Sequence, residues 1–150
     1  MKNTIKLLSI AILIITFACS KTKRYSKKLD DNKWEVKTLT VDGVSDANLP
    51  ELKFNESDIY DKASKGWWYW GEEGHAEIAW QIRDKGKTFE FSNQADHVHG
   101  FEDVKASEQA INYSGVYKII KLTRNSFEIE SNETYGNKGK KVIIKMERKK

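Results

Sequence analysis

Alternating apolar and polar residues dominate the chain from about residue 29 onward. The clearest example covers residues 75–83, where the inward positions are Ala76, Ile78, Trp80 and Ile82. Alternation with period two is typical of a strand that has one buried and one solvated face. Residues 84–87 then form a predicted hairpin turn, and the chain returns over 88–92 with the same rhythm.

Six further segments show this pattern and are separated by residues that favour turns. They cover 34–41, 51–55, 66–71, 115–123, 126–131 and 140–148. With the hairpin they give about eight strands, and a meander of that length removes its exposed edges best by closing on itself. We therefore expect an all-β fold, an eight-stranded antiparallel up-and-down barrel. The chief interruption is 93–114, in which 103–111 can form a helical turn or two, and we expect it to cover one mouth of the barrel.

The first residues have the pattern of a secretory signal peptide. Lys2 and Lys6 precede an apolar run over 7–17, which is shorter than the roughly 20 residues that span a bilayer. The run leads through Ala18 to Cys19, the only cysteine of the chain. Residues 15–19 resemble the lipobox of bacterial lipoproteins, which implies that Cys19 is acylated, as by palmitate, and becomes the mature N-terminus. The alternative is an ordinary signal peptide, which would leave Cys19 as an unpaired thiol in an oxidising compartment.

Residues 20–28 carry five basic side chains and no acidic one. Low hydrophobicity and charge of one sign keep such a segment from packing, so we expect a tether that is either attracted to anionic headgroups or simply solvated. The expected division is a signal peptide over 1–18, the lipidated Cys19 and basic tether over 19–28, and one barrel domain over 29–150. The chain has 26 basic and 22 acidic residues, and this near balance argues against nucleic acid as a partner.

Spaced aromatic, glycine and aliphatic positions resemble the lipocalin-like lipoproteins of Bacteroidetes. These positions lie in 34–36, 41–43, 52–54, the tryptophan-rich 66–70 and 115–123. The resemblance covers almost the whole mature chain and implies a lipocalin-like barrel without implying a catalytic activity. Ser20 is not the aspartate that retains many lipoproteins in the inner membrane, and the tether is not acidic like a surface-export signal. By resemblance, the protein is therefore placed on the periplasmic face of the outer membrane, attached through its N-terminal lipid.

The last predicted strand gives an independent reason to expect a closed end of the barrel. Val142, Ile144, Met146 and Arg148 share one parity, so Arg148 faces inward at the strand's end if the three apolar residues do. In lipocalins an arginine late in the last strand covers the tryptophan of the first strand, and the resemblance gives these roles to Arg148 and Trp34, as a cation–π pair. The alternative is that Arg148 extends into solvent beside its basic neighbours.

Residues with metal-ligand or catalytic chemistry are few. His97 and His99, close to Asp96, Glu102 and Asp103, form the only cluster of metal-ligand types. Two histidines in a polar loop are more often solvated, so they are weak candidates and we expect no metal. The chain has no nucleophile elbow, phosphate loop or metalloprotease helix, so we expect neither an enzyme nor a bound cofactor.

Inward-facing large side chains are the remaining candidates for a binding site. The candidate cavity-lining residues are Trp68, Trp70, Ile78, Trp80, Phe89, Phe91 and Tyr117. Such side chains can line a pocket for a small apolar or amphipathic ligand, or they can fill the barrel. In the first case, which the sequence slightly favours, the protein is a membrane-anchored binding module. In the second it is a structural or accessory lipoprotein that contacts another envelope protein, using loops and the outward-facing Trp67 and Tyr69.

Overall fold

A computed structural model describes residues 21–60, 63–72, 74–94 and 101–150 of the chain. A short helix over 21–29 comes first. The other elements, in chain order, are β1 (Asn32–Val41), β2 (Val44–Ser45), β3 (Glu51–Tyr60), β4 (Ala63–Trp70), β5 (Gly74–Arg83), β6 (Thr88–Asn93), α2 (Phe101–Tyr113), β7 (Gly115–Leu122), β8 (Ser126–Thr134) and β9 (Asn137–Arg148). All ladders between these strands are antiparallel.

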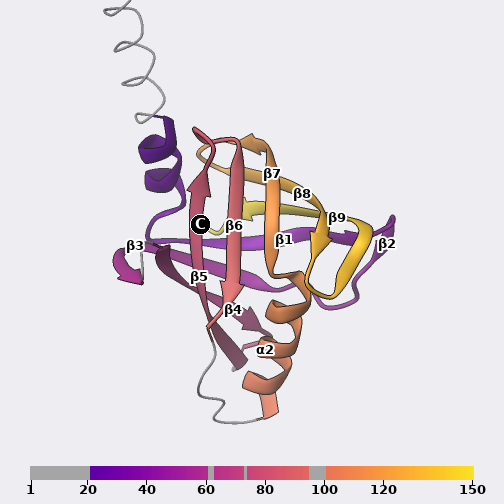
Figure 1. The fold of residues 1–150 in the computed structure, drawn as a ribbon. Helices are drawn as coiled ribbons and strands as arrows, with labels where there is room; N and C mark the ends of the chain where they lie inside the picture. Colours follow the sequence, from indigo (N-terminus) through magenta and orange to yellow (C-terminus); the bar gives the residue numbers. More distant parts are fainter. Residues whose placement is uncertain (1–20, 61–62, 73, 95–100) are drawn as a thin grey trace, which may run out of the picture.

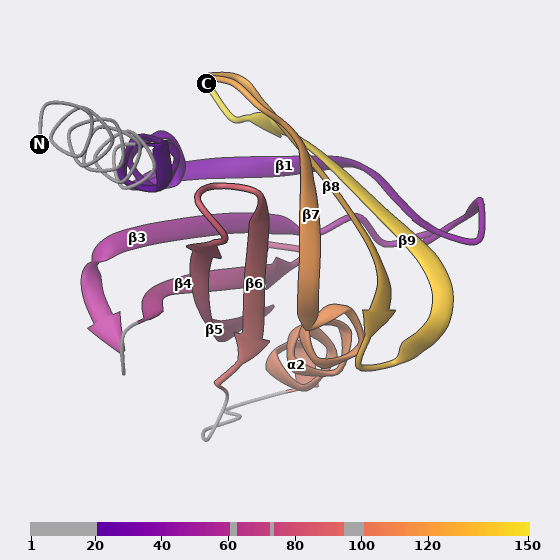
Figure 2. The ribbon, with the colours of Figure 1, turned by 45° about the horizontal axis from the view of Figure 1, so that its top comes forward.

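The sheet closes because β1 pairs with β3 on one side and with β9 on the other. In the closing ladder Trp34 lies opposite Arg148, and Val41 lies opposite Val142. The strands β1 and β3 to β9 therefore form a closed barrel, while the two-residue β2 pairs only with β1. The predicted eight-stranded antiparallel up-and-down barrel is confirmed (Figure 1 and Figure 2).

The expected strand segments 51–55 and 66–71 are shorter than β3 and β4, the corresponding strands of the structure. The β3–β4 ladder continues to Tyr60 opposite Ala63, past a register shift between Asn55 and Ile59. Residues 56–58 are polar and break the alternation, which is why the sequence pattern ends the strand at residue 55. Backbone pairing with the neighbouring strand extends the hairpin here.

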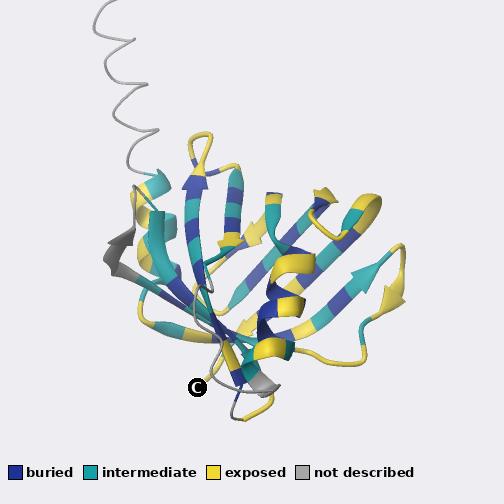
Figure 3. Cartoon of the chain, turned by 60° about the horizontal axis from the view of Figure 1, so that its bottom comes forward, coloured by how far each residue is buried: buried dark blue, intermediate teal, exposed yellow. Residues whose placement is uncertain are grey.

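A single core fills the barrel and follows the predicted parity. In β5 every second residue from Gly74 to Ile82 is buried, as the alternation predicted. Figure 3 shows the same alternation of buried and more exposed positions along the other strands. The largest fully buried side chains are Trp34, Trp68, Trp80, Tyr117, Phe54, Phe89, Phe91 and Phe127.

One end of the barrel is covered by α2, the 13-residue helix within the long excursion between β6 and β7. Its buried residues Ala106, Ala110 and Tyr113 recur at helical spacing and turn one face toward β4, β5 and β6. Two alanines on that face allow the helix to approach the strands closely. The predicted helical segment exists and is longer than one or two turns. We call this end, with the loop 42–50 and the turn 135–136, the α2 end.

The opposite end is covered by residues 21–29, which were expected to be an unpacked tether and are instead a helix. Tyr25 and Leu29, one turn apart, face the barrel; Leu29 is fully buried and Tyr25 packs against the core. The helix ends at Leu29, and two residues later Asp31 has a left-handed φ of 53° and donates its backbone N–H to the Phe54 carbonyl at 2.8 Å. We call this end, with the turns 84–87 and 123–125, the N-terminal end.

Candidate functional site

Six of the seven candidate cavity-lining residues are core residues that contact one another. Trp68, Ile78, Trp80, Phe89, Phe91 and Tyr117 are each no more than 2% exposed. Ring centroids lie 5.5 Å apart between Trp68 and Phe91, and 5.7 Å apart between Phe91 and Tyr117. Aromatic rings in direct contact have centroids about 4.5–7 Å apart, so no ligand fits between these rings. They fill the barrel instead of lining a pocket.

A second group of rings continues this packing toward the N-terminal end. Phe54 lies 5.3 Å from Trp80 and 5.6 Å from Phe89, centroid to centroid, with the rings steeply inclined to each other. Phe89 meets Phe127 edge to face at 5.2 Å. These contacts join the strands across the interior, since β3, β5, β6 and β8 each contribute a ring.

Trp70 differs from the other candidates because it is the last residue of β4. It is only partly buried, although it packs against the core. With Asp46, Gln109 and Tyr113 it lines a hollow of about 300 Å³ at the α2 end. Trp68 and Trp70 share a parity, but only Trp68 lies deep enough in the barrel to be enclosed on all sides.

A buried polar network fixes α2 to the barrel. The Trp68 indole Nε1 donates to Gln109 Oε1 at 2.8 Å, and Gln109 Nε2 donates to the Asn48 carbonyl at 2.8 Å. The Tyr113 hydroxyl donates to Asp46 Oδ2, also at 2.8 Å. Gln109 and Tyr113 thus connect α2 to the loop 42–50. Gln109 also accepts the hydrogen bond of the buried Trp68 indole.

The network restricts the ionisation of two tyrosines. Burial, reinforced by the hydrogen bond to Asp46 and by its negative charge, raises the pKa of Tyr113 well above the usual value. Burial also raises the pKa of Tyr117, whose hydroxyl donates to the Tyr113 carbonyl. Both hydroxyls therefore stay protonated at neutral pH and act as hydrogen-bond donors, which is a structural role.

This network was not anticipated from the sequence. Gln109 and Asp46 are polar residues in segments that lie between the predicted strands, and nothing in the sequence pattern marks them for burial. The spacing of Ala106, Ala110 and Tyr113 was an available signal, because it marks an apolar helix face that must be covered.

A second hollow at the α2 end lies between β6 and the β8–β9 hairpin and has a volume of about 480 Å³. Its lining includes Phe91, Glu133, Tyr135 and Lys138. It lies where the ladder between β6 and β7 ends, with Phe91 opposite Gly115. Tyr135 is 70% exposed at its rim. This hollow combines apolar surface with charges of both signs.

At the N-terminal end, Trp34 is fully buried and meets Phe127 edge to face at 6.1 Å. Its Nε1 is buried and has no hydrogen-bond partner among the described residues. Arg148 is the cross-strand neighbour of Trp34 and is partly exposed, but the cation–π contacts formed by the described residues do not join the two. The expected stack is therefore not formed, and helix 21–29 covers this end instead because Leu29 is seated in the core.

The outward-facing aromatics of β4 carry cations over their rings. The ammonium groups of Lys53 and Lys65 each lie 5.6 Å from the Trp67 ring centroid, and that of Lys33 lies 5.1 Å from the Tyr69 centroid. Both aromatic side chains are only partly exposed as a result. The predicted parity of β4 is confirmed, and its outward pair is covered by lysine side chains instead of forming an open apolar patch.

Three candidate residues, Cys19, His97 and His99, lie outside the described residues. Within the described part, no group of three or more His, Cys, Asp or Glu side chains is placed to hold a metal ion. None of the helices in the described ranges has the length and apolar character needed to cross a membrane.

No protein-family model and no curated protein matches the chain. The function must therefore be argued from the barrel, its two covered ends and its surface.

Proposed function

We propose that this protein is a non-catalytic envelope lipoprotein, acylated at Cys19 and held on the periplasmic face of the outer membrane, whose barrel is a rigid body that binds another envelope protein through its α2 end. The packed interior carries this proposal. A barrel whose inward rings contact one another leaves its outer surface as the place for recognition. The signal-like segment before Cys19 supports the anchoring, because it is too short to span a bilayer and ends at the chain's only thiol.

The choice of the α2 end rests on where apolar side chains are exposed. Seven large hydrophobic side chains are exposed among the described residues, and five of them lie on α2, the loop 42–50 or the turn 135–136. These five are Val44, Leu49, Val104, Ile111 and Tyr135. Exposed apolar groups gathered on one side of a protein mark contact sites for partners.

This end is also rigid, which lowers the entropy lost on binding. The Gly136 N–H donates to the Asn112 carbonyl at 3.0 Å, so the β8–β9 turn is tied to the C-terminal turn of α2. Gln109 and Tyr113 tie the loop 42–50 to the same helix. The three segments that carry the exposed apolar groups therefore form one preorganised surface.

Photocrosslinking in cells tests this proposal. A benzophenone amino acid at Val44, Ile111 or Tyr135 should give a discrete crosslinked product. The same group at Ile120, an exposed residue on the outer wall of β7, is the matched control and should not. Equal products from all four positions, or none from the α2 end, would contradict the proposed surface.

The lipid anchor is tested separately. Cys19→Ser should remove fatty-acid labelling and move the protein from the membrane to the soluble fraction. Unchanged fractionation would show that the anchor is assigned wrongly, whatever the crosslinking shows.

A second candidate function is binding of a small amphipathic molecule in the 480 Å³ hollow beside Tyr135. Its volume lies within the usual range of about 300–1,000 Å³ for ligand sites, and its apolar lining next to Lys138 suits an acyl chain with an anionic head. A fluorescent fatty acid should then bind the protein, and Tyr135→Ala should weaken that binding. Binding that is unchanged in Tyr135→Ala, or no binding at all, would eliminate this hollow.

A further inference from the structure

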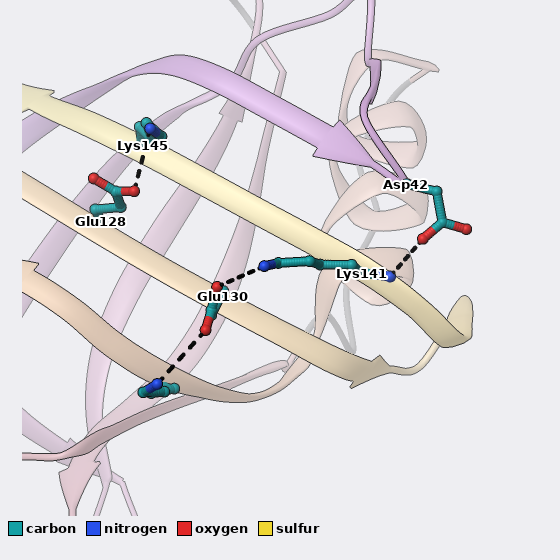
Figure 4. A network of polar contacts seen from close by, with 6 residues as sticks. Asp42, Glu128, Glu130, Lys141 and Lys145 are labelled. Atoms are coloured by element: carbon teal, nitrogen blue, oxygen red, sulfur yellow. Dashed lines mark hydrogen bonds and ion pairs between the residues drawn. The ribbon is translucent and has the colours of Figure 1, made fainter.

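The helix over 21–29 carries five basic side chains on nine residues. Lys21, Lys23, Arg24, Lys27 and Lys28 form no ion pair with any described residue. The barrel wall is different, because several of its lysines face carboxylates across the strands. Lys145 Nζ lies 3.2 Å from Glu128, and Lys141 Nζ lies 3.1 Å from Glu130 (Figure 4). Five basic side chains without an ion pair among the described residues therefore lie together on this one helix.

The helix is fixed to the barrel, so these charges have fixed positions. Leu29 is fully buried, and Lys28 Nζ donates to the Leu122 carbonyl at 3.3 Å. The Lys21 side chain lies so close to the turn 84–87 that a Cβ on Gly86 would come within 3.2 Å of its Cγ. Lys23, Arg24 and Lys27 point away from these contacts and are exposed.

The other described turns of the N-terminal end and the C-terminal residues have the same sign of charge. Residues 21–31, 84–87, 123–125 and 147–150 together hold eleven basic and four acidic side chains. The C-terminal residues belong to this end, because the Arg148 N–H donates to the Asn125 carbonyl at 3.1 Å, and Figure 2 shows the C-terminus beside the turn between β7 and β8. At the α2 end, residues 42–50, 71–72, 103–113 and 135–140 hold five acidic and three basic side chains. Charge is thus polarised along the barrel axis among the described side chains.

We propose that the N-terminal end of the barrel docks on an anionic lipid surface, with the exposed face of helix 21–29 as the contact. This inference rests on the proposed acylation of Cys19. Two residues of chain reach at most about 7 Å, so an acyl group on Cys19 would hold Lys21, the first described residue of the helix, at the level of the lipid headgroups. The barrel then stands upright on the bilayer, and its α2 end points away from the membrane.

Orientation on vesicles tests the docking. The mature protein extracted from membranes is reconstituted into vesicles of phosphatidylcholine alone or of phosphatidylcholine with phosphatidylglycerol, each doped with a lipid that carries a nitroxide on its headgroup. A thiol-reactive fluorophore is placed at the N-terminal end in Asn125→Cys or at the α2 end in Tyr135→Cys. Both positions are exposed, and neither substitution changes the net charge.

Docking predicts that the label at position 125 is quenched much more strongly than the label at 135, and only when phosphatidylglycerol is present. Each basic residue near an anionic surface contributes about fivefold to binding, so Lys23→Gln with Arg24→Gln should weaken docking about 30-fold and remove the difference. Lys138→Gln with Lys140→Gln, at the other end, is the control with the same net charge and should preserve it. Equal quenching at the two positions, quenching that ignores phosphatidylglycerol, or equal effects of the two double variants would overturn the proposal.

The same labels separate this proposal from the lipid anchor. In an acylated protein the sulfur of Cys19 is blocked, so the parent protein should take up no fluorophore. Labelling of the parent at Cys19 would refute the acylation, whereas an unlabelled parent whose two ends are quenched equally would refute the docking alone.

Discussion

Replacing Gln109 by alanine should destabilise the protein even though the residue is polar and lies on a helix outside the sheet. Its Oε1 is the acceptor for the Trp68 indole, whose ring is fully buried. Alanine leaves that N–H without a partner, which costs about 1–3 kcal/mol, and loses about 1 kcal/mol of buried aliphatic contact. The Asn48 carbonyl, the other partner of Gln109, belongs to an exposed residue and can turn to water. The expected loss of unfolding free energy is therefore about 2–4 kcal/mol.

Urea unfolding followed by tryptophan fluorescence measures this loss. The matched control is Glu108→Ala, one residue earlier on the exposed face of α2, where only a surface ion pair with Lys105 at 3.1 Å is lost. It should stay within about 0.5 kcal/mol of the parent. If Gln109→Ala is as mild as the control, the network does not hold α2 in place and the reasoning fails.

A double-mutant cycle isolates the hydrogen bond itself. Trp68→Phe removes the donor and Gln109→Leu removes the acceptor, and each single change leaves one buried polar group unsatisfied. The double variant leaves none in this pair, so its cost should be smaller than the sum of the single costs by about 1–2 kcal/mol. Strict additivity would mean that the 2.8 Å contact contributes nothing measurable.

Three further predictions concern the core, alkaline pH and the histidines. Trp34→Ala should cost about 3–5 kcal/mol in denaturant unfolding, because the ring is fully buried; a loss below about 1 kcal/mol would show that this end of the barrel can collapse around the gap. The raised pKa of Tyr113 means that the unfolded chain ionises first, near the usual 10.0, so the contribution of Tyr113 to stability should be constant below about pH 10 and fall as the pH rises beyond it, and Tyr113→Phe should reduce that slope. His97→Ala with His99→Ala should change stability by less than about 0.5 kcal/mol if both are solvated loop residues; a large loss, together with stabilisation of the parent by added metal, would reveal a metal site.

The sequence predicted the barrel wall well because each wall strand satisfies its own local rule. In β5 the period-two alternation determines which side chains turn inward, and the ladders to β4 and β6 follow from hairpin connections. The ends of the barrel were harder to predict, because their structure depends on contacts that are distant along the chain. Gln109 is buried only because Trp68 supplies an unsatisfied donor beneath it.

The helix over 21–29 shows the limit of composition as a guide. Five basic residues and low hydrophobicity make the segment resemble a solvated tether. The segment is held against the barrel because Leu29 is part of the core and Tyr25 packs against it. Arg148 lies opposite Trp34 with the predicted parity. It makes no cation–π contact with the Trp34 ring, and helix 21–29 covers this end of the barrel.

The pairing of β1 with β9 also determines when the protein can fold. The hydrogen bond from the Lys141 N–H to Asp42, at the end of that ladder, joins residues 99 positions apart. Contacts between such distant residues form late and slow the folding of a chain. The edge of β1 that pairs with β9 therefore stays unpaired until most of the chain has been synthesised. The barrel therefore cannot close during most of translation. A chain that is to pass through an export channel must likewise stay unfolded until it has crossed.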